Sequence, residues 1–229
     1  MLMGSLSSLY GEVTAEDLLQ QVRHSAVLQK FDMTGDIKKN GKKFPIHLFL
    51  RGKDIQFLID EGKSQDGFHI RMENHGFEMR EIVERKARLM PKSRLDDAIK
   101  GTDVTYEDLA MRFLYWKQSQ IVGTEKVRLQ ECYKVRLINP DKGSGQYKIV
   151  YVWIHKKYGA LMQVVGYNQE GKPLKRFAVT KLQRAGESQT LKKLQIDSID
   201  PKNNKVTGQT YIVFDRPIPV NSQSNQPAR

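Results

Sequence analysis

Cysteine is almost absent from this chain of 229 residues, in which Cys132 is the only one. A single thiol excludes a disulfide scaffold and a metal cluster held by several cysteines. Long apolar runs are missing as well, since none approaches the roughly 18 to 20 residues that a membrane-spanning helix needs. The sequence therefore predicts a soluble or peripheral protein rather than a transmembrane channel.

The motifs of catalysis and of nucleotide or metal binding are also lacking. There is no GxSxG nucleophile elbow, no glycine-rich phosphate loop and no GxGxxG fingerprint. The five histidines form neither HxH nor HExxH. The adjacent carboxylates Glu107 and Asp108 point about 100° apart on a helix, so we interpret them as capping and solvated groups. We expect no enzyme activity, no cofactor and no metal site.

Positive charge is in excess and unevenly spread. The chain has 38 Lys and Arg against 26 Asp and Glu, a net charge of +12. Residues 1–100 hold 17 basic and 15 acidic side chains, whereas residues 101–229 hold 21 and 11. An anionic partner fits this excess, although solubility alone also explains it. Because acidic residues dilute the basic ones and no RNA-binding aromatic motif occurs, we expect no nucleic-acid binding.

The two ends of the chain differ from its middle. Residues 1–12 lack the basic and apolar regions of a signal peptide, so we interpret them as a flexible stub, either a trimmed signal or a frayed start. Residues 217–229 are polar and interrupted by proline, which predicts a disordered tail. One domain is expected over residues 13–216, because an all-β fold of this size commonly remains a single domain.

Two of the three helix signals are simple capped segments. Thr14 is a good N-cap for an amphipathic helix over residues 14–24. Ser93 is expected to cap a short helix over residues 92–99.

The third helix signal has the form of a capping box. Thr105 and Asp108 have the required spacing at the start of a segment over residues 105–116. Together with the segment 92–99 it forms a helical insertion at about residues 92–116. The apolar side chains expected on one face of this segment are Leu109, Phe113 and Trp116.

Most of the remaining chain alternates apolar and polar residues with a period of two. Asn40-Gly41 separates two such runs and predicts a tight hairpin. The segment Tyr147–Ile154 is apolar on both faces and indicates a central strand. We expect about 10 to 11 strands with short turns in a single antiparallel sheet, which curls at that size. The fold class is thus mainly β (α+β), an incomplete barrel with helices covering or plugging its concave face.

Aromatic and methionine side chains are the candidates for a binding site. A curled sheet presents more inward apolar surface than short helices fill, and the surplus makes a ligand cavity. The alternative is that these side chains are ordinary core. The residues expected to line the cavity and the plug are Phe49, Phe57, Leu109, Phe113, Trp116, Tyr133, Tyr151, Trp153 and Met162.

A resemblance to a known family rests on three strings, Gly101-Thr-Asp-Val-Thr-Tyr-Glu-Asp-Leu109, Tyr151-Val-Trp-Ile-His155 and Gly171-Lys-Pro-Leu-Lys175. With these strings the chain resembles the bacterial outer-membrane lipoprotein-sorting family, the LolA/LolB-like superfamily, from the first helix to about Phe214. The resemblance implies a periplasmic carrier whose incomplete barrel holds the acyl chains of a lipoprotein or lipid. It also implies that Arg51 contacts the helical lid.

The resemblance further implies the kind of partner. An inner-membrane transporter or an outer-membrane acceptor would exchange the cargo, with peripheral membrane contact, and a monomer is favoured. The N-terminal cysteine of anchored acceptors is missing, which favours a soluble shuttle. The alternative function is a non-lipid periplasmic interaction module or an adaptor for an envelope transporter, as the basic second half would suit.

Overall fold

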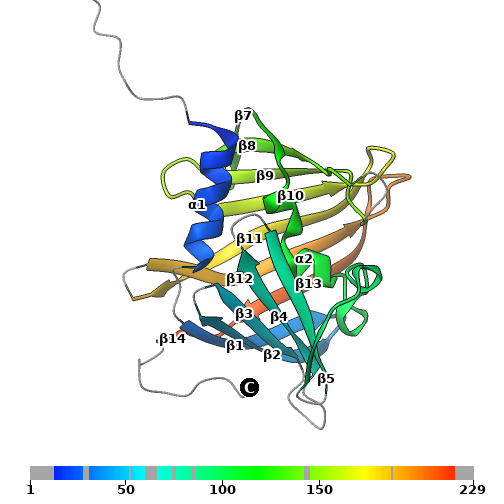
Figure 1. Cartoon of the computed structure of the whole chain (residues 1–229). Helices are drawn as coiled ribbons and strands as arrows, with labels where there is room; N and C mark the ends of the chain where they lie inside the picture. Colours follow the sequence, from blue (N-terminus) through cyan, green and yellow to red (C-terminus); the bar gives the residue numbers. More distant parts are fainter. Residues whose placement is uncertain are drawn as a thin grey trace, which may run out of the picture.

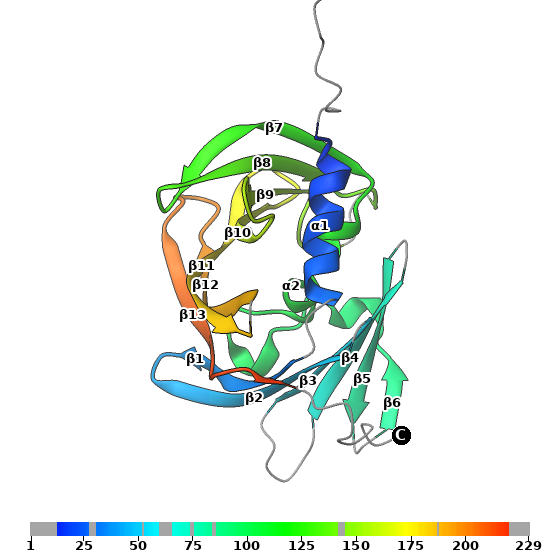
Figure 2. The same ribbon diagram turned by 90° about the vertical axis from the view of Figure 1, so that its left-hand side faces the viewer.

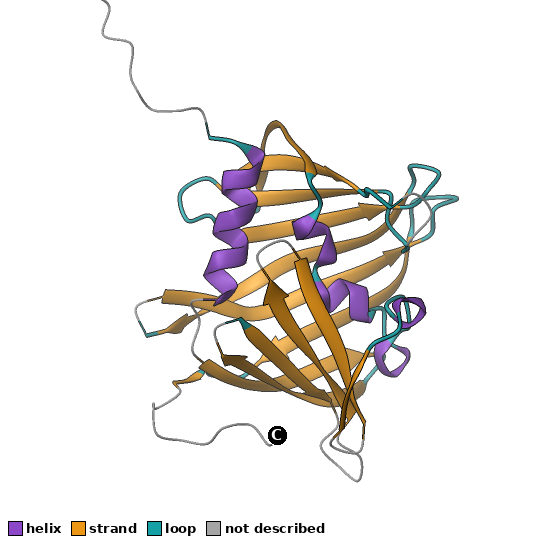
Figure 3. Ribbon diagram, in the orientation of Figure 1, coloured by secondary structure: helices purple, strands orange, loops and turns teal. Residues whose placement is uncertain are grey.

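The computed structural model describes residues 13–27, 31–51, 53–59, 66–73, 76–83, 86–141, 145–186 and 188–219. They form one antiparallel sheet with the helices on its concave side (Figures 1 and 3). The helices are α1 (Ala15–Val27) and α2 (Tyr106–Ala110), and three 3-10 turns are η1 (Lys92–Arg94), η2 (Ile99–Gly101) and η3 (Arg112–Tyr115). The strands are β1 (Phe31–Lys39), β2 (Lys42–Arg51), β3 (Asp54–Ile59), β4 (Asp66–Glu73), β5 (Gly76–Val83), β6 (Lys86–Leu89), β7 (Gln118–Val127), β8 (Gln130–Ile138), β9 (Ile149–His155), β10 (Leu161–Tyr167), β11 (Pro173–Ala185), β12 (Ser188–Ile199), β13 (Val206–Phe214) and β14 (Ile218–Pro219).

The sheet curls without closing. Its strand order is β6-β5-β4-β3-β2-β1-β13-β12-β11-β10-β9-β8-β7, which leaves β6 and β7 as the two edges of the described sheet. Strands β1 to β6 pair in sequence order, as do β7 to β13, and the pairing of β1 with β13 joins the two halves of the chain. The predicted fold class is confirmed. The path holds thirteen strands instead of ten or eleven, partly because β6 is exposed along its whole length and carries no alternating signal.

Local turn chemistry fixes the first hairpin. Asn40 and Gly41 have φ angles of 49° and 77°, the left-handed pair that a type I′ turn requires. This turn sets the register of β1 and β2, in which Lys39 lies opposite Lys42 and Asp32 opposite Phe49. The hairpin prediction is confirmed.

Helix α1 begins where its cap predicts. The Thr14 hydroxyl accepts a hydrogen bond from the Asp17 backbone N–H at 3.1 Å, and the Asp17 carboxylate accepts one from the Thr14 N–H at 3.0 Å. This reciprocal pair satisfies donors that the first turn leaves free. The Thr14 hydroxyl also donates to the Asp17 carboxylate at 2.7 Å, and this bond, followed by the one from the Thr14 N–H, lowers the pKa of Asp17. The helix therefore starts as the sequence indicates and extends to Val27, beyond the predicted end.

The insertion is less helical than predicted. Residues 92–99 form no α-helix: η1 is followed by a turn and bend over residues 95–97, the bridge residue Ala98 and the start of η2, and Pro91 takes the N-cap position of η1 in place of Ser93. The segment 105–116 keeps its capping box, yet α2 ends after five residues at Met111, whose φ is 47°. The short turn η3 follows. Tertiary packing has overridden local propensity here, since the break allows the chain to turn beneath the sheet.

The end of the described chain also differs from expectation. Ile218 and Pro219 form β14, which pairs with Asp32 and Phe31 of β1. These two residues are thus ordered within the segment 217–229, which was expected to be a disordered tail. The rest of that tail, from residue 220, and the expected stub at residues 1–12 lie outside the described residues. Within the described ranges, no helix has the length and apolarity to cross a bilayer.

Candidate binding interior of the sheet

The concave face of the sheet is lined by continuous rows of apolar side chains. On one half, Met33, Leu48, Phe57 and Phe68 are neighbours in register across β1 to β4, and all four are buried. The Phe57 and Phe68 rings stack with their centroids 4.7 Å apart. The corresponding row on the other half consists of Val135, Val152, Val164, Phe177 and Ile196.

Helix α1 covers part of this face. Figure 2 shows it lying across the opening between β7 and the end of the sheet formed by β4 to β6. Its apolar side is buried in the main core through four residues, Ala15, Leu18, Leu19 and Val22. One polar link runs from Arg23 Nη1, which donates to the Leu114 carbonyl in η3 at 2.6 Å. The covering by α1 is therefore mainly apolar.

The insertion between β6 and β7 is fastened differently, beginning at Asp103. The Asp103 carboxylate accepts hydrogen bonds from Thr210 Oγ1 at 2.7 Å, Ser198 Oγ at 2.8 Å and Lys39 Nζ at 3.1 Å. These donors lie on β13, β12 and β1. Burial would raise the pKa of Asp103, but the three hydrogen bonds outweigh it and lower the pKa. The ionised carboxylate thus ties the insertion to three strands.

Asp108 is a second buried attachment point. Its carboxylate accepts hydrogen bonds from Tyr147 Oη at 2.6 Å, Lys175 Nζ at 2.6 Å and the Thr105 N–H at 2.8 Å. The Asp108 side chain is fully buried and that of Lys175 is 10% exposed. Burial, followed by the Asp108 charge, raises the pKa of Tyr147 well above its usual value. Asp108 therefore both caps α2 and forms an ion pair with Lys175 of β11.

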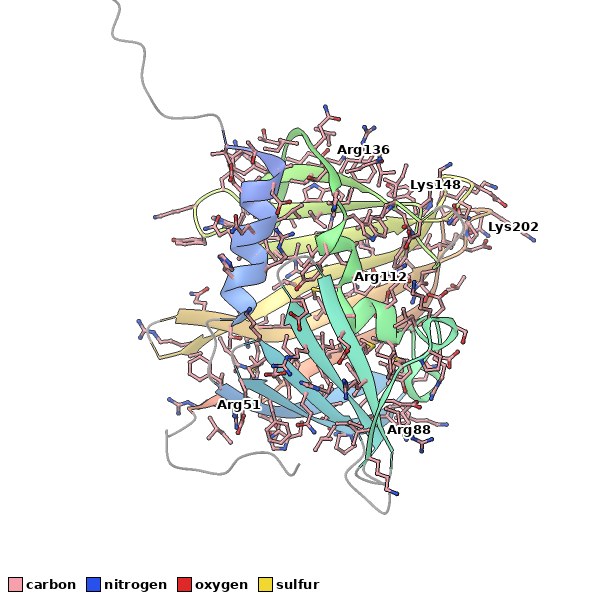
Figure 4. All side chains as sticks on the ribbon, viewed as in Figure 1. Arg51, Arg88, Arg112, Arg136, Lys148 and Lys202 are labelled. Carbon is pink, nitrogen blue, oxygen red and sulfur yellow. The ribbon has the colours of Figure 1, made fainter. Side chains whose placement is uncertain are left out.

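Glu107, next to Asp108, is also buried and pairs with Arg112. Arg112 Nη2 lies 2.9 Å from Glu107 Oε1, and Figure 4 labels Arg112 beside this turn. Glu107 Oε2 has no hydrogen-bond partner among the described residues. Burial and the nearby Asp96 carboxyl raise the pKa of Glu107 to about 7, against the opposing effect of Arg112. We refer to Asp103, Glu107 and Asp108 with their partners as the polar anchor.

Five of the predicted site residues lie on the inner side. Phe57, Phe113 and Trp116 are buried members of the main core, and Leu109 and Tyr133 pack against it partly buried. Phe57 comes from β3, Tyr133 from β8, and the others from the insertion. The structure thus brings side chains from distant parts of the chain together under the curled sheet.

The other four predicted site residues, Phe49, Tyr151, Trp153 and Met162, lie outside the main core. Trp153 and Met162 belong to a second, smaller cluster with Tyr151 packed against it. Trp153 donates a hydrogen bond to Glu125 at 2.9 Å, and Lys134 Nζ lies 5.1 Å from the Trp153 ring centroid. A register shift between Leu161 and Gln163 accompanies the placement of Met162 in this outer cluster.

Phe49 and Arg51 lie together on the outer side of β2. Phe49 alternates with the buried Leu48 and Leu50, and its ring stacks on His47 with centroids 3.9 Å apart. Arg51 forms a bidentate ion pair with Asp32 of β1, at 2.5 and 3.0 Å. The hydrogen bonds of Arg51 therefore run along the sheet, whereas a lid contact was predicted.

A pocket of about 210 Å³ lies between the insertion and β3 to β5. Its apolar wall includes Ile59 and Ile99, and its polar side includes Glu81, Arg94 and Lys100. Glu81 and Arg94 form an ion pair. The volume is below the roughly 300 to 1,000 Å³ typical of ligand pockets. This pocket by itself is therefore smaller than a site for a long acyl chain.

The residues that sequence reasoning missed are the acidic members of the polar anchor. Glu107 and Asp108 were interpreted as solvated, but they are only 1% and 3% exposed. Asp103 was not singled out. A signal was present, because all three lie in the string Gly101–Leu109 that carries the family resemblance. Among the described residues, no group of three His, Cys, Asp or Glu side chains could hold a metal ion.

Comparisons with known proteins agree with this architecture. Residues 83–222 match the model of a protein family described as "-like: Uncharacterized protein". No curated protein sequence matches the chain. A crystal structure of a DUF1329 family protein from Desulfovibrio piger has a TM-score of 0.69 at 16% identity, covering 92% of this chain and 93% of that one.

Two further crystal structures share the fold. A putative outer membrane lipoprotein-sorting protein domain from Vibrio parahaemolyticus has a TM-score of 0.69 at 13% identity, covering 89% of this chain and 91% of that one. A LolA superfamily protein from Nitrosomonas europaea has a TM-score of 0.66 at 15% identity, covering 92% and 95%. At these identities the likeness concerns the fold alone, and it shows that this chain has a LolA-like fold.

Proposed function

The chain belongs to the protein family whose model matches residues 83–222, and from that premise and its LolA-like fold we propose that it is a carrier of acyl chains in the bacterial cell envelope. The acyl chains of a lipoprotein or lipid would bind between the concave face of the sheet and the helices. The protein would act as a soluble periplasmic shuttle, with no catalytic step.

The observation that carries this proposal is the contrast between the two coverings of the apolar face. The polar anchor fixes the insertion to four strands and to Tyr147 in the segment before β9, whereas α1 rests mainly on apolar side chains. Apolar contacts with α1 can be exchanged for apolar contacts with a ligand at little net cost, because both remove the same surface from water. Displacement of α1 would therefore open the interior while the insertion stays in place.

The energetic scale suits such a carrier. Each CH₂ group removed from water contributes about 0.8 kcal/mol, so one long acyl chain offsets the loss of the α1 contacts. We propose that Phe57, Leu109, Phe113, Trp116 and Tyr133 contact the bound chain. Arg51 is not proposed as a lid contact, because its guanidinium pairs with Asp32.

Transfer of the cargo requires a partner that accepts it. We propose an inner-membrane transporter as the donor or an outer-membrane protein as the acceptor, with this chain acting as a monomer. The second candidate function, a non-lipid adaptor for an envelope transporter, is favoured by the outside of the sheet, where the partly buried Tyr151 ring lies 5.2 Å from Lys134 Nζ above the buried Trp153.

The experiment that tests the proposal is native mass spectrometry of the protein purified from its own host, followed by lipid extraction. Bound acyl chains are expected. Binding of a fluorescent fatty acid should then weaken in Leu109→Trp, which fills the interior, and stay unchanged in Tyr151→Ala on the outer face. Circular dichroism checks that both variants fold.

Two results would overturn the proposal. One is the absence of any acyl chain in the native protein together with no binding of the fluorescent fatty acid. The other is equal weakening by Leu109→Trp and Tyr151→Ala, which would place binding outside the interior. Capture of an envelope transporter that Leu109→Trp leaves intact would favour the adaptor instead.

A further inference from the structure

The turn between β7 and β8 places a large apolar side chain in solvent. Leu129 is 88% exposed and is followed directly by β8. Arg128 and Leu129 have φ angles of 49° and 66°, so both occupy the left-handed region that side chains with a Cβ adopt only at a cost. The solvent exposure of Leu129 and the backbone conformation of Arg128 and Leu129 are therefore both unfavourable when nothing is bound to this turn.

Another two-residue hairpin turn of this chain has nearly the same φ angles and uses residues that favour them. The β1–β2 turn has φ angles of 49° and 77° and uses Asn40 and Gly41, residues that favour this conformation. The β7–β8 turn uses arginine and leucine with nearly the same angles. The difference indicates that the side chains of Arg128 and Leu129 have a role other than forming the turn.

A second exposed apolar side chain lies on the same rim of the sheet. Tyr158, in the turn between β9 and β10, is 68% exposed, and Lys157 Nζ lies 5.3 Å from its ring centroid. The Lys156 backbone N–H donates to the Glu131 carbonyl at 2.9 Å, which joins this turn to the start of β8. Figure 2 looks onto this rim.

The end of β11 completes the rim. Arg128 Nη1 donates to the Thr180 carbonyl at 2.9 Å, which brings the β7–β8 turn against β11. Leu182, two residues beyond Thr180, is 38% exposed. We define the turn rim as residues 126–131, 156–160 and 181–185.

The turn rim is strongly basic. Its three segments contain six basic side chains and one acidic side chain, Glu131. Glu131 is engaged by Lys126 at 3.6 Å and by Lys156 at 3.8 Å. Cations surrounding exposed leucine and tyrosine side chains match a bilayer surface, where anionic headgroups attract the cations and the interface accepts apolar and aromatic groups.

We propose that the turn rim docks on an anionic lipid bilayer, with Leu129 and Tyr158 inserted between the headgroups and the lysine and arginine side chains contacting lipid phosphates. Single exposed apolar residues are common on proteins, but here three of them share one basic rim. The docking needs no bound cargo, so it goes beyond the proposed carrier function and can be tested without it.

The test is co-sedimentation of the full chain with vesicles of phosphatidylcholine containing phosphatidylglycerol, and with vesicles of phosphatidylcholine alone. Binding to the anionic vesicles is expected, weakening as salt is added. Leu129→Glu should weaken it about tenfold to a hundredfold, the value of burying one leucine side chain. Lys156→Gln and Lys157→Gln should each weaken it about fivefold.

Matched controls come from the opposite rim. Val206, at the start of β13, is 51% exposed, and Lys202 and Lys205 lie in the turn before it. Figure 4 labels Lys202 far from α1. Val206→Glu and Lys202→Gln should leave vesicle binding unchanged. Thermal unfolding shows that each variant folds, and Leu129→Gly, which relieves the turn, separates loss of the side chain from loss of the fold.

Three results would overturn the proposal. These are equal binding to both kinds of vesicle with no salt dependence, equal losses from Leu129→Glu and Val206→Glu, or full binding by a stable Leu129→Gly variant. Unchanged acyl-chain binding by Leu129→Glu is expected. A variant that loses vesicle binding but keeps acyl-chain binding is therefore altered only in the turn rim. The docking proposal would also remain valid if the carrier proposal failed.

Discussion

The two helical parts that cover the concave face are held by different kinds of interaction. Helix α1 buries a small set of apolar side chains, including Leu19, and Arg23 links it to η3 through a hydrogen bond. The insertion buries three carboxylates, and two of them, Asp103 and Asp108, meet donors on strands from both halves of the sheet. Apolar contacts are non-directional and tolerate sliding, whereas buried ion pairs are costly to break. The insertion is therefore fastened by directional interactions, whereas α1 is held by contacts that a ligand would replace in the carrier function proposed above.

The strongest way to break this comparison is to remove the charge of Asp108. Asp108→Asn leaves Lys175 buried without its counter-ion, and losing one partner of a buried pair costs about 3 to 5 kcal/mol. We expect the free energy of unfolding of the whole sheet to fall by that amount, measured by urea denaturation. The control is Glu16→Gln in α1, an exposed group expected to change stability by less than about 0.5 kcal/mol. A loss below about 1 kcal/mol for Asp108→Asn would mean that the anchor does not hold the insertion.

Shortening one buried side chain of α1 should lower the free energy of unfolding less, and the effect should stay local to the helix. Leu19→Ala removes a fully buried side chain from the core side of α1, which costs about 2 kcal/mol or more. We expect the backbone amides of α1 to exchange with solvent faster, while those of β12 and β13 change little. Hydrogen exchange followed by mass spectrometry measures both. Equal acceleration in α1 and the sheet would contradict a separately opening helix.

The ionisation of Glu107 makes the stability contributed by the insertion depend on pH. Its pKa in the folded protein, about 7, is above the usual 4.5, so the stability it contributes is present below about pH 4.5 and is lost as the pH rises through 7. Relative to the native protein, Glu107→Gln should gain about 3 kcal/mol over that range. Urea denaturation at several pH values measures the difference. A difference independent of pH would contradict the raised pKa.

The smallest expected effect is at the start of α1. Thr14→Ala removes the hydroxyl that accepts the Asp17 N–H, and losing such a cap costs about 1 kcal/mol. The loss should appear as faster exchange at the first turn of α1, with Thr14→Ser restoring the native rate. If the change also accelerated exchange in the insertion, the two coverings would not be independent.

Much of the fold follows from local sequence signals. The Asn40-Gly41 turn, the Thr14 cap and the Thr105–Asp108 capping box are all where short-range rules place them, because each depends on residues within one turn of chain. The strands with alternating apolar and polar residues were also predicted from the sequence. Strand β6 was not, because all four of its residues are exposed and give no hydrophobic signal.

The candidate site was less accessible to sequence reasoning. In β9, Val152 and Ile154 point inward while Tyr151 and Trp153 point outward, yet all four are apolar or aromatic. A strand that is apolar on both faces cannot reveal which face is concave. The break of α2 at Met111 had no local cause either, since methionine favours helices.

The sequence by itself determined where the strands, turns and helix caps lie, because these depend on backbone preferences and on side chains a few residues apart. Only the tertiary structure decided which carboxylates are buried. The partners of Asp103 and Asp108 stand far along the chain, with Lys39 64 residues away, Lys175 67 residues away and Thr210 107 residues away. An acidic side chain is solvated or buried according to whether such partners reach it, and chain folding alone brings them together.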